Sequence, residues 1–244
     1  MKPKPLHLSI LTLLACSASS WAASIYTSGH ADIGFAYEGF NDPYNHFHAE
    51  GAIVDDVFVA DQEYDAADIV IRLPNTSATT GGSGATFLDI APTSTYWRLR
   101  PTLSGAAADN APYLGLASEE LVPAEWLGAN NVKFALTNFS GPGDFALYDS
   151  DGLYWDTADG VVTAADDVYA FFALGHSHFN WAFSAPGTYE LEITMSGTHL
   201  NDGVQSATET YTFEVVPEPG TASLLGLGLL GLVARRRRPS SPAK

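Results

Sequence analysis

Short segments in which apolar and polar residues alternate run through almost the whole of residues 23–216. Successive side chains of a β-strand point to opposite faces, so this alternation predicts strands with one face turned to a core. Turn sequences separate the segments, among them Gly-Pro-Gly at residues 141–143 and Pro-Gly at residues 186–187. Many short strands with almost no helix predict an all-β fold, a single antiparallel β-sandwich domain over residues 23–215.

Helical structure is expected in one place only. Residues 118–128, SEELVPAEWLG, predict a helical turn in which Ser118 is the N-cap and Glu119 and Glu120 occupy the first turn. Residues 74–84, PNTSATTGGSG, predict a polar loop within the domain and not a linker between two domains.

Residues 1–22 have the order of parts of a secretory signal peptide. Lys2 and Lys4 precede an apolar run at residues 6–15, and a small-residue Ser-Trp-Ala sequence ends the segment. The apolar run is too short to remain as a membrane span. The sequence therefore predicts export.

The same segment fits a second kind of export signal. LLAC at residues 13–16 resembles a bacterial lipoprotein signal, in which Cys16 would become the lipidated first residue. Whether Cys16 is lipidated or removed with the signal peptide stays open. Because Cys16 is the only cysteine, an intrachain disulfide and a thiolate metal site are both excluded.

Residues 216–244 carry a Pro-Glu-Pro triplet, an apolar segment at about residues 222–234 and a cluster of four arginines. The apolar segment is shorter than the roughly 20 residues that span a bilayer comfortably, and its arginines would stay on the cytoplasmic side. The residues of the triplet and the cluster are Pro217, Glu218, Pro219, Arg235, Arg236, Arg237 and Arg238.

This order of parts resembles the PEP-CTERM sorting signal. The resemblance implies transient insertion of a transmembrane helix into the inner membrane of a Gram-negative, exopolysaccharide-making bacterium. It further implies exosortase as the processing partner, and a final location at the cell surface or in the extracellular matrix.

Residues 23–216 are strongly acidic. Only four of the 11 basic residues lie there, against 27 of the 28 acidic residues, which gives a net charge of −23. Such a surface disfavours nucleic acid and anionic membranes as partners, and it attracts cations.

Two His-x-His pairs and one further histidine stand out in NHFHAE (residues 45–50), GHSHFNWAF (residues 175–183) and GHADIGFAY (residues 29–37). Strand alternation places the aromatic and aliphatic residues of these segments on the core face. It places the following residues on the opposite face: His30, Asp32, His46, His48, His176, His178 and Asn180.

Histidines gathered from neighbouring strands could supply three or four nitrogens to one ion. Imidazole suits a divalent transition metal such as zinc or copper. The predicted ligands are His30, His46, His48, His176 and His178, with Asp32 and Glu50 as possible additional ligands. His199 falls in a predicted turn and is not included.

The three histidine segments together resemble the choice-of-anchor M domain of bacterial surface proteins. The C-terminal segment also resembles an actinobacterial wall-anchored repeat, in which a histidine pair precedes Asn-Trp-x-Phe and a Pro-Gly-x-Tyr turn. Members of the family carry interchangeable anchors, and some actinobacterial relatives are associated with transporters similar to metal-ion permeases. The resemblance implies a metal-binding surface protein with those histidines at matching positions, and a metal-uptake system as a possible partner.

Other functions are less well supported. Residues 146–160 bring together four carboxylates, those of Asp149, Asp151, Asp156 and Asp159. Their spacing departs from an EF-hand calcium loop, so a solvated turn is favoured over Ca²⁺ binding. Carbohydrate binding, or a purely structural role in the matrix, is the alternative function, since tryptophans can stack on sugars from an extracellular polysaccharide. The candidate platforms are Trp97, Trp126, Trp155 and Trp181. No nucleophile elbow and no His-Glu-x-x-His helix is found, so the chain is expected not to be an enzyme.

Overall fold

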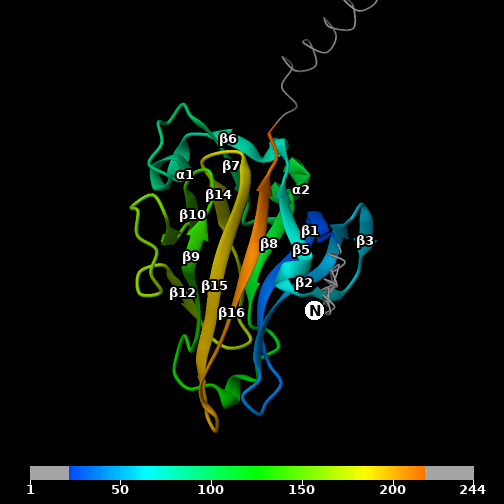
Figure 1. Ribbon diagram of the computed structural model, residues 1–244, viewed down its shortest axis with the longest axis vertical. Helices are drawn as coiled ribbons and strands as arrows, with labels where there is room; N and C mark the ends of the chain where they lie inside the picture. The colour runs from blue at the N-terminus through cyan, green and yellow to red at the C-terminus, as the bar shows by residue number, and fades with distance from the viewer. Residues whose placement is uncertain (1–21, 218–244) are drawn as a thin grey trace, which may run out of the picture.

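The computed structural model describes residues 22–217. These residues form two β-sheets packed face to face (Figure 1). The larger sheet has the order β12-β9-β15-β16-β5-β1-β2-β3, while β4 pairs with β2, β8 with β1, and β13 with β8. Its strands are β1 (Ser24–Tyr37), β2 (Pro43–Val54), β3 (Val57–Val59), β4 (Gln62–Tyr64), β5 (Ile69–Leu73), β8 (Pro112–Ala117), β9 (Val132–Ser140), β12 (Val168–Phe171), β13 (His176–His178), β15 (Gly187–His199) and β16 (Gly203–Val215).

The smaller sheet has the order β11-β10-β14-β7-β6. Its strands are β6 (Ala78–Thr80), β7 (Thr95–Leu99), β10 (Phe145–Tyr148), β11 (Leu153–Asp156) and β14 (Asn180–Phe183). The helices of the described residues are short: α1 (Gly82–Phe87), α2 (Leu103–Asp109) and the 3-10 turns η1 (Ala66–Asp68), η2 (Asn75–Ser77) and η3 (Pro123–Glu125).

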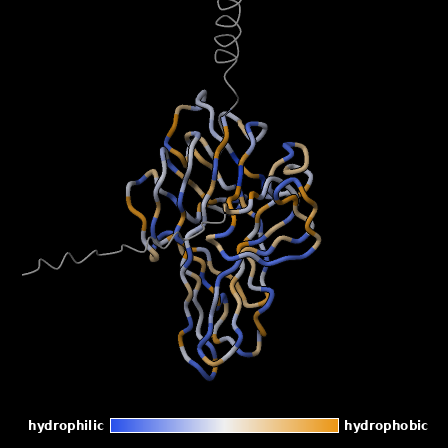
Figure 2. The backbone as a smooth tube through the Cα atoms, turned by 45° about the vertical axis from the view of Figure 1, so that its right-hand side comes forward, coloured by the Kyte–Doolittle hydropathy of each residue, from blue (hydrophilic) through white to orange (hydrophobic). Residues whose placement is uncertain are grey.

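Aromatic side chains from both sheets fill the space between them. Trp181 of the smaller sheet stacks on Phe213 of the larger one at a ring-centroid distance of 5.4 Å, and Trp155 meets Trp181 edge-on at 5.7 Å. All three are fully buried. Figure 2 shows hydrophobic and hydrophilic residues alternating along the strands, which turns one face of each sheet towards the core. The predicted all-β sandwich is confirmed.

Strand β1 changes its neighbour halfway along its length. One edge pairs with β2 throughout, whereas the other pairs in parallel with β5 as far as Tyr26 and with β8 from Gly29 onward. At Gly29, φ is +87° and a Cβ atom would overlap the carbonyl oxygen of Gly51, so only glycine fits at this change of partner. The larger sheet therefore contains parallel strand pairs, β1 with β5 and β1 with β8, whereas only antiparallel pairs were predicted.

The predicted strand over residues 175–183 is two strands. β13 ends at His178 in the larger sheet, and β14 begins at Asn180 in the smaller one, so Phe179 lies at the crossing with its side chain buried. The expectation that Asn180 shares a face with the histidines is therefore wrong. Asn180 is buried and donates a hydrogen bond to the backbone oxygen of Tyr148 (3.1 Å).

The helical turn predicted over residues 118–128 does not begin at Ser118. Only η3 is helical there, and Ser118 caps no helix. Its hydroxyl instead donates to the backbone oxygen of Phe172 (3.2 Å) and accepts from the backbone N–H of Gly175 (3.1 Å). Ser118 thereby fixes the loop that leads into β13.

Helices α1 and α2 were not predicted. The sequence of α1, GSGATF, has low helix propensity. It is helical because Ala85 and the following Leu88 pack with Tyr96 on the outer face of the smaller sheet. Helix α2 does carry a signal, since Thr102 accepts from the backbone N–H of Gly105 at the N-cap (3.2 Å) and Asn110 ends the helix in the left-handed conformation.

Among residues 22–217, no helix has the length and apolar character needed to cross a bilayer. The predicted signal peptide up to residue 21 and the predicted sorting helix beyond residue 217 lie outside the described residues.

Candidate metal centre

Three adjacent strands bring four of the predicted ligands together. His30 and Asp32 come from β1, His176 and His178 come from β13, and β8 runs between the two strands. Gly115 of β8 is the register partner of both Asp32 and His178. Because Gly115 has no side chain, the ligands of the two outer strands can meet above it.

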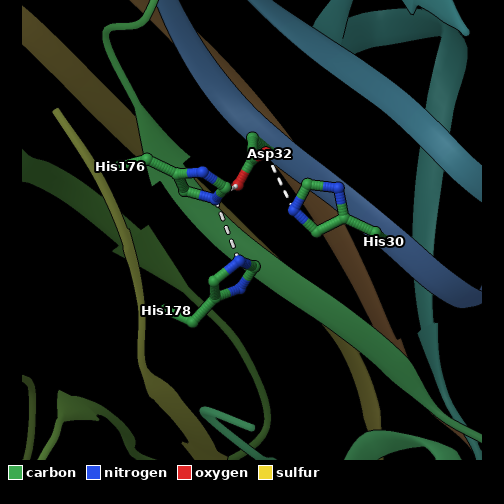
Figure 3. A group of neighbouring side chains, drawn as sticks. All are labelled: His30, Asp32, His176 and His178. Carbon is green, nitrogen blue, oxygen red and sulfur yellow. Dashed lines mark hydrogen bonds and ion pairs between the residues drawn. The ribbon is translucent and has the colours of Figure 1, made fainter. Parts of the chain in front are cut away.

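The four side chains converge on one point (Figure 3). Nε2 of His176 lies 2.9 Å from Nε2 of His178 and 3.0 Å from Oδ1 of Asp32. Nε2 of His30 lies 3.3 Å from Oδ2 of Asp32. One donor atom from each of the four residues lies within 4.8 Å of all the others.

Nε2 of His176 carries at most one hydrogen but contacts two acceptors, Nε2 of His178 and Oδ1 of Asp32. If Nε2–H of His176 donates to His178, then Oδ1 of Asp32, a buried atom, has no hydrogen-bond donor. The Asp32 side chain is 3% exposed, and its ion-pair partners among residues 22–217 are His30 and His176. A buried carboxylate is costly without a cation, so the site favours a positive charge at its centre.

Carboxylates also contact the outward-facing ring nitrogens. Nδ1 of His176 lies 3.2 Å from Glu119, and Nδ1 of His30 lies 3.5 Å from Glu50. Such carboxylate–histidine contacts orient metal-binding imidazoles and raise their basicity. Glu50, predicted as a possible ligand, therefore lies on the far nitrogen of His30 and outside the convergent group.

The pKa values of the two β13 histidines move in opposite directions. Contact with the Asp32 carboxylate is the main cause that raises the pKa of His176, against the opposing effect of burial. Burial lowers the pKa of His178 to about 4. Tyr113 contributes to that burial, since its ring stacks on His178 at 3.6 Å with an interplanar angle of 9°. His178 is thus held in the neutral form that binds metals.

The spacing of these atoms is close to that of the ligand atoms around a tetrahedral ion. With zinc–nitrogen and zinc–oxygen bonds of about 2.0–2.1 Å, the ligand atoms of a tetrahedron stand about 3.3–3.4 Å apart. Nε2 of His176 lies 2.9 Å from His178 and 3.0 Å from Oδ1 of Asp32, slightly below this spacing, and Nε2 of His30 lies 3.3 Å from Oδ2 of Asp32. A set of three imidazoles and one carboxylate is chemically suited to zinc or copper.

His46 and His48 belong to a second group. The third member of this group is Glu120, whose Oε1 lies 3.0 Å from Nε2 of His46. Nε2 of His48 lies 2.8 Å from Oδ1 of Asp61. The hydrogen bond with His46 is the main cause that lowers the pKa of Glu120. The five predicted histidines are therefore divided between two groups, in place of the single site that was predicted.

Sequence reasoning missed several residues of this region. Glu119 and Glu120 were interpreted as the first turn of a helix, but they follow β8 and reach the two histidine groups. Gly115 and Tyr113 carried no sequence signal. The acidic pair directly after a strand was the feature that could have indicated a second source of ligands.

The residues of the alternative interpretations lie elsewhere. The four candidate tryptophans are at most 8% exposed, so none offers a free ring face for a sugar: Trp97, Trp126, Trp155 and Trp181. Oδ1 of Asp149 accepts hydrogen bonds from the backbone N–H of Asp151 (2.7 Å) and from the hydroxyl of Tyr154 (2.9 Å), which agrees with a turn.

Replacing Gly115 by alanine is expected to disrupt the metal centre. The new Cβ would overlap Oδ1 of Asp32 and crowd the backbone oxygen of Ser177 at 2.9 Å, so the ligand atoms must separate. We expect zinc affinity, measured by competition with a chromophoric chelator, to fall by about 10–100-fold, as for a lost supporting contact. Gly152→Ala is the matched control, because its Cβ would meet nothing within 4 Å. Equal affinity in both variants would contradict the convergence above Gly115.

Comparison with known proteins identifies the C-terminal tail. Residues 215–238 match the PEP-CTERM protein-sorting motif, which implies processing by exosortase and supports an exported protein sorted to the cell surface. No curated protein and no solved structure matches the chain.

Proposed function

We propose that this chain, exported and sorted by its PEP-CTERM motif, is a cell-surface or matrix protein that binds a divalent transition metal. His30, Asp32, His176 and His178 are the ligands, and the ion is zinc or copper. The observation that carries the proposal is the contact of one nitrogen, Nε2 of His176, with both His178 and the buried oxygen of Asp32.

The surroundings support this assignment. Residues 23–216 carry a net charge of −23, which raises the local concentration of cations. Because the ligands come from the first strand and from a strand late in the chain, a bound ion would cross-link distant segments of a domain that lacks cysteine. A structural or scavenging role follows. The resemblance to the choice-of-anchor M domain, with its link to metal uptake, agrees with this role and stays a prediction.

The test is metal analysis of the full chain, purified without a polyhistidine tag. We expect at least one zinc or copper ion per chain at neutral pH, with the content lowered by one equivalent in His178→Gln. His199→Gln is the matched control, because His199 lies outside both histidine groups. Substoichiometric zinc and copper in the unaltered protein would refute the proposal.

Zinc binding is expected to weaken as the pH falls, beginning above pH ~6.5, the ordinary pKa of imidazole. The pKa of His176 is raised by Asp32, so zinc must displace a proton from this ring near neutral pH. His178, with its pKa lowered to about 4, stays free of a proton over the same range. Zinc affinity measured between pH 6 and 8 tests this expectation, and an affinity that does not change over that range would contradict it.

The metal-free protein should show the opposite trend. The pair of protonated His176 and Asp32 stabilises the fold fully below pH ~6.5, and its contribution is lost as the pH rises through the raised pKa of His176. Melting temperatures in a chelator should therefore fall as the pH rises above 6.5, whereas those in zinc should not. Parallel profiles in the two conditions would contradict the coupling of Asp32 to His176.

Carbohydrate binding remains the alternative function and makes a different prediction. The protein would be retained on the polysaccharide of the producing organism, and a chelator would not release it. Because the candidate tryptophans are buried, such binding would have to use other residues.

A further inference from the structure

The second histidine group has its own position on the sheet. His46 and His48 lie on β2, on the edge of β1 opposite to β8, and their register partners on β1 are Gly34 and Asp32. The ring of His46 covers Gly34, where a Cβ would overlap the imidazole. Gly34 thus leaves room for His46 as Gly115 leaves room for the first group.

The ligand atoms of this group are already assembled. One donor atom each from His46, His48 and Glu120 lies within 4.8 Å of the other two. His46 is only 5% exposed, and its Nδ1 is buried with no hydrogen-bond partner. The imidazole of His46 and the carboxylate of Glu120 supply two ligands of the two-histidine, one-glutamate set found in open zinc sites, and His48 supplies the third.

A pocket of about 120 Å³ is lined by these residues and by Glu119, which also contacts His176 of the first group. One water molecule takes about 30 Å³ of liquid volume, so the pocket holds a few waters or one small anion. The first group has four convergent ligand atoms, enough to fill a tetrahedral shell, whereas the second has three. The second group therefore leaves one coordination position facing the pocket.

We propose that His46, His48 and Glu120 form a second divalent-metal centre whose fourth position takes an exchangeable water or small anion. The inference goes beyond the proposed function, which needs only the first group. Nε2 of His48 lies 2.8 Å from Oδ1 of Asp61, which places a further carboxylate at the exposed side of this group. The surface would then carry two metal ions on neighbouring strands, one with four protein ligands and one with an exchangeable fourth ligand.

The test is cobalt(II) titration of the full, untagged chain, followed by visible absorption with and without azide. We expect two cobalt ions per chain, with azide changing the absorption of one of them. His48→Gln should bind one ion and show no response to azide. His178→Gln should also bind one ion and keep the response.

A second pair of variants guards against loss of folding. Glu120→Gln should behave like His48→Gln, and exposed Glu209→Gln should behave like the unaltered protein. One ion per chain that is lost in His178→Gln and retained in His48→Gln would overturn the second centre and leave the proposed function standing. An azide response that survives in both His48→Gln and Glu120→Gln would also overturn it. No bound ion at all would refute both proposals.

Discussion

Asp32→Asn is expected to reduce zinc affinity by about 100-fold or more, because losing even an outer partner of a metal ligand costs about 10–100-fold. Asp32 supplies the only carboxylate among the four convergent residues, and its side chain is almost completely buried. Asparagine keeps the size and one oxygen but removes the charge that holds the cation. Competition with a chromophoric chelator measures the change.

The metal-free form separates this effect from a loss of folding. In a chelator at pH 8, Asp32→Asn should unfold at the same urea concentration as the unaltered protein or at a higher one, because a buried charge has been removed. Asp42→Asn, at an exposed position in the turn after β1, is the matched control and should keep full zinc affinity. Unchanged affinity in Asp32→Asn would refute a metal at this point.

Trp181→Ala should have the largest effect on folding, lowering the free energy of unfolding by about 3–5 kcal/mol. The indole is fully buried between the sheets, and its Nε1–H donates to the backbone oxygen of Leu114 (3.2 Å). Alanine would leave a cavity between the sheets and remove this hydrogen bond to β8, next to Gly115. Urea unfolding followed by circular dichroism measures the loss.

The control for this prediction is Phe58→Ala on the edge strand β3. Phe58 is 66% exposed, so its removal should change the free energy of unfolding by no more than about 0.5 kcal/mol. A loss below about 1 kcal/mol in Trp181→Ala would mean that the two sheets do not depend on this residue for their packing.

The strands and their core faces could be predicted because alternation is a local property. Ile33, Phe35 and Trp181 are buried as their spacing indicated. The change of partner along β1 was not predictable in the same way. It depends on the close approach of Gly29 to Gly51, which are distant in the sequence. The split between β13 and β14 depends on which sheet each half joins, and alternation does not report this.

The candidate site was predicted in its residue types but not in its grouping. Alternation indicated that His30, Asp32 and the two His-x-His pairs avoid the core, and this needed no knowledge of strand order. Their division into two groups follows from β1 lying between β8 and β2. The His46 and His48 pair on β2 therefore lies on one side of β1, and the His176 and His178 pair on β13 lies on the other. Strand order across the sheet is a tertiary property that one sequence does not reveal.

The position of β16 determines how the domain bears a mechanical load. Tension transmitted from the C-terminal tail enters at Val215 and runs along β16, which is flanked by β15 over its whole length and by β5 near Val215. Both ladders are then loaded in shear, so their hydrogen bonds resist together and do not open one after another. A surface protein tethered through this strand would hold its shape under flow.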